Sequence, residues 1–178
     1  MNASRALLLT GGLATGKTAV AREVVAVAAE RALRVAAVDL DWLGWATGAT
    51  LGVDELIGRN LTDVAANYAQ AGIDDLVLAR ALLNPLSLQA VREALPGWEV
   101  VVVRLDASRS TLEGRVRARD SGAELDEHLA EIDEMTERAL KTAPSAPVVL
   151  NEERTLREVA LEVMRLARWI DQQALGDM

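Results

Sequence analysis

Short apolar runs alternate along this chain with longer stretches whose apolar residues recur at helical spacing. The short runs are rich in Leu and Val and predict five strands: Arg5–Thr10, Arg34–Val38, Asp75–Ala79, Glu99–Leu105 and Pro147–Leu150. The longer stretches predict helices over Lys17–Ala32, Leu61–Gln70, Pro85–Leu95, about Glu124 to Lys141 and about Thr155 to Gln173. A further helix carries Arg115 to Arg119 and is capped by Ser108 or Ser110, and the segment Trp42 to Gly52 is expected to be a loop or a short helix. This alternation of strands and helices predicts an α/β fold around a mostly parallel sheet.

The chain is expected to form a single domain over residues 1–178. That length is typical of one domain, and the sequence contains neither an internal repeat nor a linker long enough to separate two units. With 51% hydrophobic and 26% charged residues, the composition excludes a disordered or collagen-like chain.

Composition and charge also exclude several classes of function. The absence of Cys rules out disulfides, thiolate zinc sites and cysteine nucleophiles, and a single His, His128, rules out a metal site built from several His. The net charge of −8 argues against a broad nucleic-acid-binding surface, because such a surface needs clustered cations. No apolar run approaches the ~20 residues of a membrane-spanning helix. We therefore expect a cytoplasmic protein that binds neither nucleic acid nor membrane, and the sequence leaves its oligomeric state open.

The segment from Gly11 to Thr18 reads GGLATGKT and matches the pattern G-x-x-x-x-G-K-[ST]. It follows a predicted strand and opens a predicted helix, which is the context in which such a loop binds phosphate. Glycines let successive backbone N–H groups converge on an anion, and the helix adds the positive end of its dipole. Lys17 is then expected to contact the β- and γ-phosphates of ATP, and the Thr18 hydroxyl to coordinate Mg²⁺. The expected nucleotide-binding residues are Gly11, Gly12, Leu13, Ala14, Thr15, Gly16, Lys17 and Thr18.

Two acidic residues, Asp39 and Asp41, follow the second predicted strand. On an extended segment, side chains two residues apart point to the same face, so both carboxylates are expected to converge on one site. One of them can hold Mg²⁺ through water. The other can accept the proton of an acceptor hydroxyl or orient its oxygen for in-line attack. The residues alone leave open which acid has which role.

The class of nucleotide-binding protein is narrowed by elements that the chain lacks. No N-K-x-D element for reading a guanine base is present, and Asn151 to Arg154 at the corresponding strand end does not match it. Motor-type ATPases end an apolar strand in Asp-Glu, whereas the third predicted strand here has no acid at its end. Asp106 follows the fourth strand, where it either imitates such an element or ends the strand and begins a helix cap.

On these residues the chain resembles the small P-loop kinases, the superfamily of shikimate, gluconate, adenylylsulfate and nucleoside or nucleotide kinases. Beside the loop and the acid pair, the resemblance rests on the Val-rich strand leading to Arg104–Ser108, the arginine-bearing helix 110–119, and the last strand and helix within Pro147–Arg168. It therefore covers most of the chain. It implies a three-layer P-loop fold with a five-stranded parallel sheet and a small helical lid. It also implies that Asp39 organises the magnesium shell and that Asp41 engages the acceptor hydroxyl.

The resemblance places the lid at about residues 115–130. Arg115 and Arg119 lie four residues apart and share a helix face, a spacing suited to closing over polyphosphate and neutralising the charge that develops during transfer. Arg117 points elsewhere and is expected to be solvated. His128, on the following charged helix, is expected to face solvent.

The resemblance places the acceptor-binding region at about residues 42–72. Trp42, Trp45 and Tyr68 gather there, either as a surface on which the acceptor stacks or as the core of a small helical subdomain. Arg59 and Arg80 are the candidates for clamping an anionic or polyhydroxylated acceptor. Arg80 qualifies because the carboxyl ends of parallel strands open onto the ligand crevice.

The acceptor itself is not named by the sequence. The Gly-rich element that shikimate kinases carry after the third strand is replaced here by Ala79-Arg80-Ala81-Leu82. No arginine signature typical of nucleotide acceptors is present either.

These features predict a kinase that depends on ATP and Mg²⁺ and transfers the γ-phosphoryl group to a hydroxyl of a small molecule. The expected catalytic residues are Lys17, Asp41, Arg115 and Arg119, the expected metal-binding residues are Thr18 and Asp39, and the expected acceptor-binding residues are Asp41, Trp42, Arg59 and Arg80. The alternatives are a nucleoside or nucleotide kinase, an antibiotic-modifying kinase similar to the chloramphenicol phosphotransferases, and a P-loop ATPase or nucleotide-binding regulator without a small-molecule acceptor.

Overall fold

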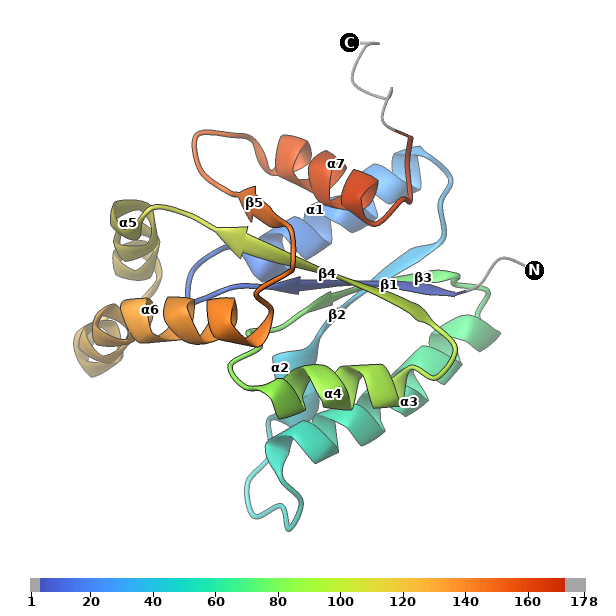
Figure 1. The fold of residues 1–178 in the computed structure, drawn as a ribbon, viewed down its shortest axis with the longest axis horizontal. Coiled ribbons are helices and arrows are strands. Elements are labelled where there is room, and N and C mark those ends of the chain that lie inside the picture. The colour runs from blue at the N-terminus through green and yellow to red at the C-terminus, as the bar shows by residue number, and fades with distance from the viewer. Residues whose placement is uncertain (1–3, 172–178) are drawn as a thin grey trace.

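A computed structural model describes residues 4–171 and shows a twisted sheet between helices (Figure 1). The strands are β1 (Arg5–Thr10), β2 (Val35–Asp39), β3 (Asp75–Ala79), β4 (Glu99–Asp106) and β5 (Val148–Leu150). They form one five-stranded parallel sheet in the order β2-β3-β1-β4-β5. The helices are α1 (Lys17–Glu30), α2 (Leu40–Gly44), α3 (Val53–Gln70), α4 (Pro85–Ala94), α5 (Arg109–Arg119), α6 (Gly122–Thr142) and α7 (Leu156–Leu166). The predicted α/β fold with a five-stranded parallel sheet is confirmed.

Helices cover both faces of the sheet and give three layers (Figure 1). In β1, Leu7 and Leu9 belong to the core beneath α1 and α7, whereas Leu8 belongs to the core beneath α3 and α4. Because both faces of the central strands are buried, these strands read as continuous apolar runs rather than as alternating ones. α5 and α6 lie beyond the carboxyl edge of the sheet, around a smaller core that includes Leu112 and Ile132.

The largest differences between predicted and observed elements concern two helices. The helix expected at Leu61–Gln70 begins at Val53, because Ile57 already packs into the core beneath α3 and extends the same apolar stripe. The helix expected to reach Gln173 ends at Leu166. Arg168 there takes a left-handed φ of 56°, and the buried Trp169 donates its backbone N–H to the Met164 carbonyl at 2.9 Å, which is the hydrogen bond of a Schellman cap. Gln173 itself lies outside the described residues.

The order of the strands produces a crevice at the carboxyl ends of β1 and β3. The chain leaves β1 toward one edge of the sheet and leaves β3 toward the other, which is the switch point where open α/β sheets bind ligands. The Arg80 N–H donates to the Leu9 carbonyl, and the Leu82 N–H donates to Thr10 Oγ1, each at 3.0 Å. These bonds hold the segment after β3 against the loop that follows β1.

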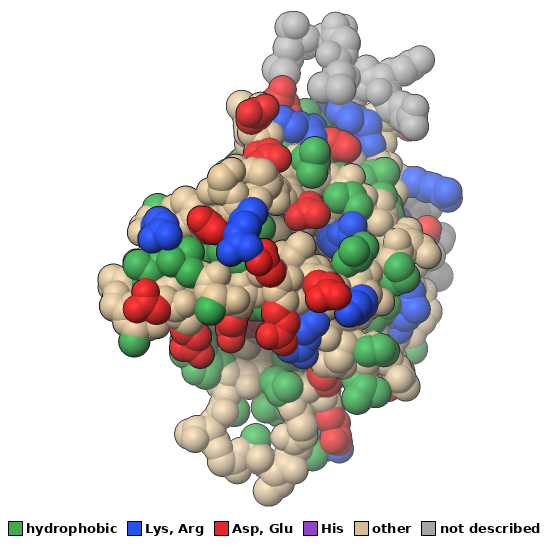
Figure 2. All heavy atoms as spheres, turned by 60° about the vertical axis from the view of Figure 1, so that its left-hand side comes forward, with side chains coloured by type: hydrophobic (Ala, Val, Ile, Leu, Met, Phe, Trp, Pro, Cys, Tyr) green, Lys and Arg blue, Asp and Glu red, His purple; other side chains and the backbone are tan. Residues whose placement is uncertain are grey.

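Three observations concern the surface and the helices of the described residues. Acidic and basic side chains lie interspersed on the face shown in Figure 2, rather than in one broad field of a single sign. The segment between α2 and α3 projects from the body of the molecule (Figure 1). Within residues 4–171, no helix combines the length and the apolar character that crossing a membrane requires.

Candidate active site

The loop between β1 and α1 has a backbone that only small residues permit. Gly11 and Gly16 have φ values of +142° and +90°, which L side chains rarely adopt. A Cβ at Gly11 would overlap the Leu105 carbonyl oxygen, and one at Gly16 would overlap the side-chain amide of Asn151. Gly11 therefore permits both the turn and the close approach of β4, and Gly16 permits the turn and the close approach of the Asn151 side chain after β5.

The start of α1 is open to an anion. It has no side-chain cap and no acidic residue in its first turn, and its first helical hydrogen bond runs from the Val20 N–H to the Gly16 carbonyl at 2.9 Å. The N–H groups of Lys17, Thr18 and Ala19 therefore have no partner within the helix. All three residues line a cavity of about 260 Å³, together with Ala14, Gly16, Arg115 and Arg119.

Lys17 lies folded over this loop. Its Nζ donates to the Gly12 carbonyl at 2.8 Å and to the Gly11 carbonyl at 3.2 Å, which uses two of its three N–H donors. Burial lowers the pKa of Lys17 from 10.5 to about 8, although Asp41 and Asp39 act in the opposite direction. An ammonium group that has lost its water is a strong partner for any phosphate that enters the cavity.

Thr18 and Asp39 form a pair of oxygen ligands beside the loop. The Thr18 hydroxyl donates to Asp39 Oδ2 at 2.8 Å, and Asp39 Oδ1 accepts from the Asp41 N–H at 3.2 Å. The expectation that Asp39 and Asp41 lie on one extended segment is wrong, because Asp39 is the N-cap of α2 and the chain turns helical at Leu40. A hydroxyl and a carboxylate are nevertheless the oxygen donors that Mg²⁺ prefers.

Asp41 presents its carboxylate to the crevice, with 70% of its side chain exposed. Its pKa lies above the ordinary value, because protein atoms displace part of its hydration and because Asp39 is nearby, while Lys17 and Arg80 oppose the rise. The side chain therefore lies near Lys17 at the start of α1, Asp39 at the end of β2 and Arg80 after β3. The structure brings the predicted acid pair together with Lys17 and Arg80, which the sequence analysis singled out in other segments.

Arg80 is the buried basic residue of the crevice. Its Nη2 donates to Asp54 Oδ1 on α3 at 2.6 Å, and its Nε lies 3.9 Å from Asp41 Oδ1. Asp54 was not singled out from the sequence, because nothing local distinguishes it from other acids in the first turn of a helix.

The other predicted acceptor residues separate in the structure. Arg59 lies on the exposed side of α3 and pairs with Glu55 one turn earlier, and its role in acceptor binding stays a prediction. Trp42 and Trp45 are 68% and 76% exposed, and their ring centroids lie 4.7 Å apart. Tyr68 instead packs against the core beneath α3. The predicted aromatic cluster is thus part surface and part core.

Comparison with known proteins adds to this geometry. No protein-family model and no curated protein sequence matches the chain. Among solved structures, the APS kinase of Mycobacterium tuberculosis in complex with AMPPNP and APS superimposes with a TM-score of 0.62 at 23% identity, over 94% of this chain and 99% of that one. A gluconokinase from Sinorhizobium meliloti gives 0.60 at 19% identity over 100% of both chains. A sugar kinase from a Janibacter species gives 0.61 at 18% identity over 93% of this chain and 95% of the other.

The chain has the fold of the small P-loop kinases. The loop 11–18 is the P-loop of this fold, placed between the first strand and the first helix. The residues predicted to form a lid, about 115–130, belong to the end of α5 and the first part of α6, and their role as a lid stays a prediction.

The Arg115 side chain on α5 donates hydrogen bonds to the P-loop and to the residue after β5. Its Nη1 donates to the Ala14 carbonyl at 3.2 Å, and its Nη2 donates to the Asn151 carbonyl. The Asn151 side chain in turn donates to the Thr15 carbonyl at 2.9 Å. Asn151 is buried after β5 and was missed, because its only signal in the sequence is a polar residue at a strand end. Arg115 therefore lines the cavity while it also fixes the P-loop to β5.

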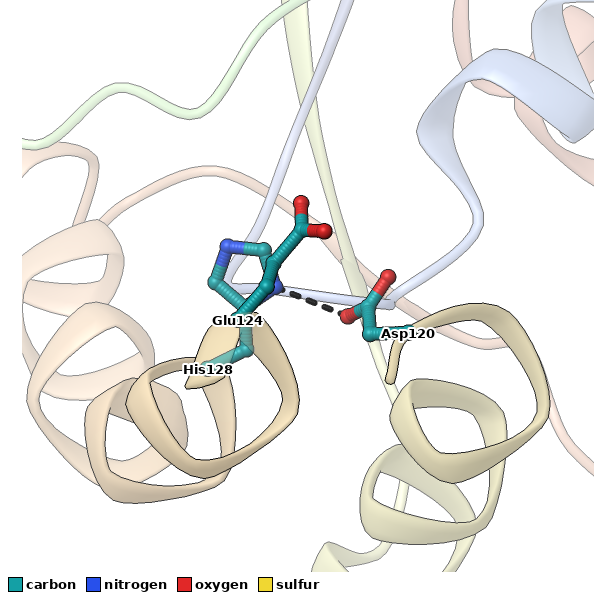
Figure 3. Close-up of side chains that lie close together, drawn as sticks. All are labelled: Asp120, Glu124 and His128. Carbon is teal, nitrogen blue, oxygen red and sulfur yellow. Dashed lines mark hydrogen bonds and ion pairs between the residues drawn. The ribbon is translucent and has the colours of Figure 1, made fainter. Parts of the chain in front are cut away.

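Arg119 reaches the same cavity from the end of α5, and Asp120 holds it. Its Nε and Nη2 donate to the two carboxylate oxygens of Asp120 at 2.6 and 2.8 Å. His128 on α6 lies 2.8 Å from Asp120 Oδ2 (Figure 3) and is half-buried, so the expectation that it faces solvent is wrong. Hydrogen bonds from Arg119 first, and then from His128, hold the pKa of Asp120 well below its usual range.

The same corner holds the one group of three His, Asp or Glu side chains among residues 4–171 whose ligand atoms are close enough to share a metal ion. Oxygen or nitrogen atoms of Asp120, Glu124 and His128 lie within 4.8 Å of one another (Figure 3). Both Asp120 oxygens are already bonded to the Arg119 guanidinium. We therefore assign this cluster to the positioning of Arg119 and not to a metal.

Proposed function

We propose that this protein is a kinase that transfers the γ-phosphoryl group of ATP to a hydroxyl group of a small molecule. One observation carries the proposal: an exposed carboxylate, Asp41, lies beside Arg80 at the end of β3 and close enough to the P-loop lysine for each to shift the pKa of the other. A nucleotide-binding regulator has no need of a base at that point. A kinase needs one to receive the proton of the acceptor.

The residues around the P-loop fit a bound nucleotide. The free N–H groups at the start of α1 and the Lys17 ammonium would hold the β- and γ-phosphates, and Arg119 faces them from α5. Thr18 and Asp39 would hold Mg²⁺, which neutralises charge on the phosphates when it is bound. Arg115 and Asn151 keep the loop in the conformation that presents these donors.

In the proposed reaction, the acceptor oxygen forms a bond to the γ-phosphorus while the bond between that phosphorus and the ADP oxygen breaks. The hydroxyl proton passes to Asp41. A carboxylate with a raised pKa is a better base than an ordinary one, because its basicity lies closer to the working pH. The positive charges of Lys17 and Arg119 stabilise the negative charge that develops on the phosphate oxygens.

The experiment that tests this function measures ADP release from MgATP with and without a panel of hydroxyl compounds. We expect a low rate alone and a higher rate with an acceptor, together with one phosphorylated acceptor molecule per ADP by mass spectrometry. ADP release that no compound stimulates, at a steady rate with MgATP alone, identifies an ATPase and overturns the proposal.

The pKa of Lys17 predicts how nucleotide affinity depends on pH. With a pKa of about 8, the ammonium is charged at pH 7 and mostly neutral at pH 9 in the free protein. Because phosphate binds the charged form, MgADP is expected to bind roughly tenfold more weakly at pH 9 than at pH 7, with uptake of about one proton at the higher pH. Titration calorimetry in buffers of different ionisation enthalpy measures both quantities. The variant Lys17→Arg stays charged and should lose the dependence, whereas a flat wild-type profile contradicts the assignment.

A further inference from the structure

Almost no part of the Arg80 side chain in the acceptor crevice is accessible to a ligand. The Arg80 side chain is 7% exposed, its Nη2 donates to Asp54, and its Nε lies beside Asp41. Its Nη1 is buried and has no partner among the residues that the structure describes. An anion that bound Arg80 would have to displace Asp54 or Asp41. The prediction that Arg80 clamps an anionic acceptor therefore does not fit its surroundings.

The charges at the acceptor end of the crevice add up to a negative value. Asp41 and Asp54 carry two negative charges and Arg80 one positive charge, which leaves −1. Arg138 on α6 donates to the Leu83 carbonyl at 3.3 Å and pairs with Glu134 at 3.4 Å, so this pair adds no net charge. Among the charged side chains Asp41, Asp54, Arg80, Arg138 and Glu134, the Asp41 side chain is the most exposed.

Two exposed indoles lie on α2, which carries Asp41, and directly after it. Trp42 directly follows Asp41 on α2, and Trp45 stacks against it with a tilt of 38° between the rings. Large aromatic side chains exposed on a protein surface indicate a binding site, and an indole face beside a carboxylate attracts a cation. The chemistry of this rim matches a protonated amine better than a carboxylate or a phosphate.

We infer that the acceptor is a hydroxylated molecule without an anionic group, and that an amine-bearing acceptor is preferred to its neutral analogue. The inference rests on the proposed function and names the substrate class of that same site. Asp41 receives the hydroxyl proton, Asp54 receives hydrogen bonds or the charge of the amine, and Arg80 is a positioning residue whose positive charge offsets the repulsion between the two carboxylates. The class differs from APS and gluconate, which are both anions.

The test compares acceptors that differ in charge on one scaffold. One series is glucosamine, glucose and glucuronate, and a second is tyramine, tyrosol and 4-hydroxyphenylacetate, added to the hydroxyl-compound panel at pH 7. We expect kcat/KM for acceptor-stimulated ADP release to be at least about tenfold higher for amines than for the matched acids. A preference for the acids overturns this inference and leaves the kinase function intact. Stimulation by no compound of any charge overturns the kinase function, and the inference with it.

Variants of Asp54 separate charge from structure. Asp54→Asn is expected to reduce the preference for amine over neutral acceptor by about tenfold, whereas Asp54→Glu keeps the charge and should restore most of it. Asp63→Asn, on the exposed side of the same helix, is the matched control and should leave the preference unchanged. Circular dichroism and MgATP affinity show whether Asp54→Asn still folds. An unaltered amine preference in a folded Asp54→Asn protein contradicts the inference.

Discussion

Replacing Asp41 with Asn is expected to lower kcat for the acceptor-dependent reaction by about 10²- to 10⁴-fold, the usual contribution of a general base. The amide has the same shape as the carboxylate but cannot take up the acceptor proton. Arg80 keeps its closer partner, Asp54, at 2.6 Å, so the crevice should remain folded. The P-loop does not bond to the Asp41 side chain, and MgATP affinity should therefore change little.

Steady-state kinetics with any acceptor found in the panel measure this effect, and calorimetry measures MgATP affinity. Asp63→Asn removes an acid from the exposed side of α3 and should leave both values unchanged. If Asp41→Asn turned over at the wild-type rate, Asp41 would not be the proton acceptor. The mechanism proposed above would then need another base.

Replacing Lys17 with Met is expected to lower kcat by about 10²- to 10³-fold. This is the usual effect of removing one hydrogen-bond donor that stabilises the negative charge of a transition state. Nucleotide affinity should also fall, because the ammonium is the only side-chain cation that bonds directly to the P-loop backbone at Gly11 and Gly12 within the described residues. Met fills a similar volume without a charge. The depressed pKa of Lys17 shows that burial disfavours the ammonium, so the variant should unfold at no lower a temperature than the wild type.

The chain provides a matched control for this experiment, because its other lysine lies far from the P-loop in sequence. Lys141 is exposed near the end of α6 and pairs with Glu137, so Lys141→Met should affect neither turnover nor nucleotide binding. Thermal unfolding with and without MgATP separates a binding defect from a folding defect. A Lys17→Met protein that MgATP stabilises as strongly as it does the wild type would contradict the assigned role.

The P-loop and the order of strands and helices could be predicted from the sequence because both depend on residues that are close together in the chain. The P-loop consists of consecutive residues, Gly11 to Thr18, so its pattern can be recognised directly in the sequence. Apolar periodicity likewise depends on near neighbours, and it placed the five strands to within a residue or two. The acids Asp39 and Asp41 were found for the same reason, although the helix that begins between them was not predicted.

The partners of the site residues were decided only by the tertiary structure. Arg80 bonds to Asp54, 26 positions earlier, Arg115 bonds to Ala14, 101 positions earlier, and Asn151 bonds to Thr15, 136 positions earlier. These pairs depend on the strand order, which sets the ends of β1, β3 and β5 along one edge of the sheet. A single sequence shows that Arg80 is basic, but only the packed chain shows that two carboxylates already hold it. The local sequence pattern therefore predicts where phosphate binds, whereas long-range packing decides which charged groups remain free at the proposed acceptor site.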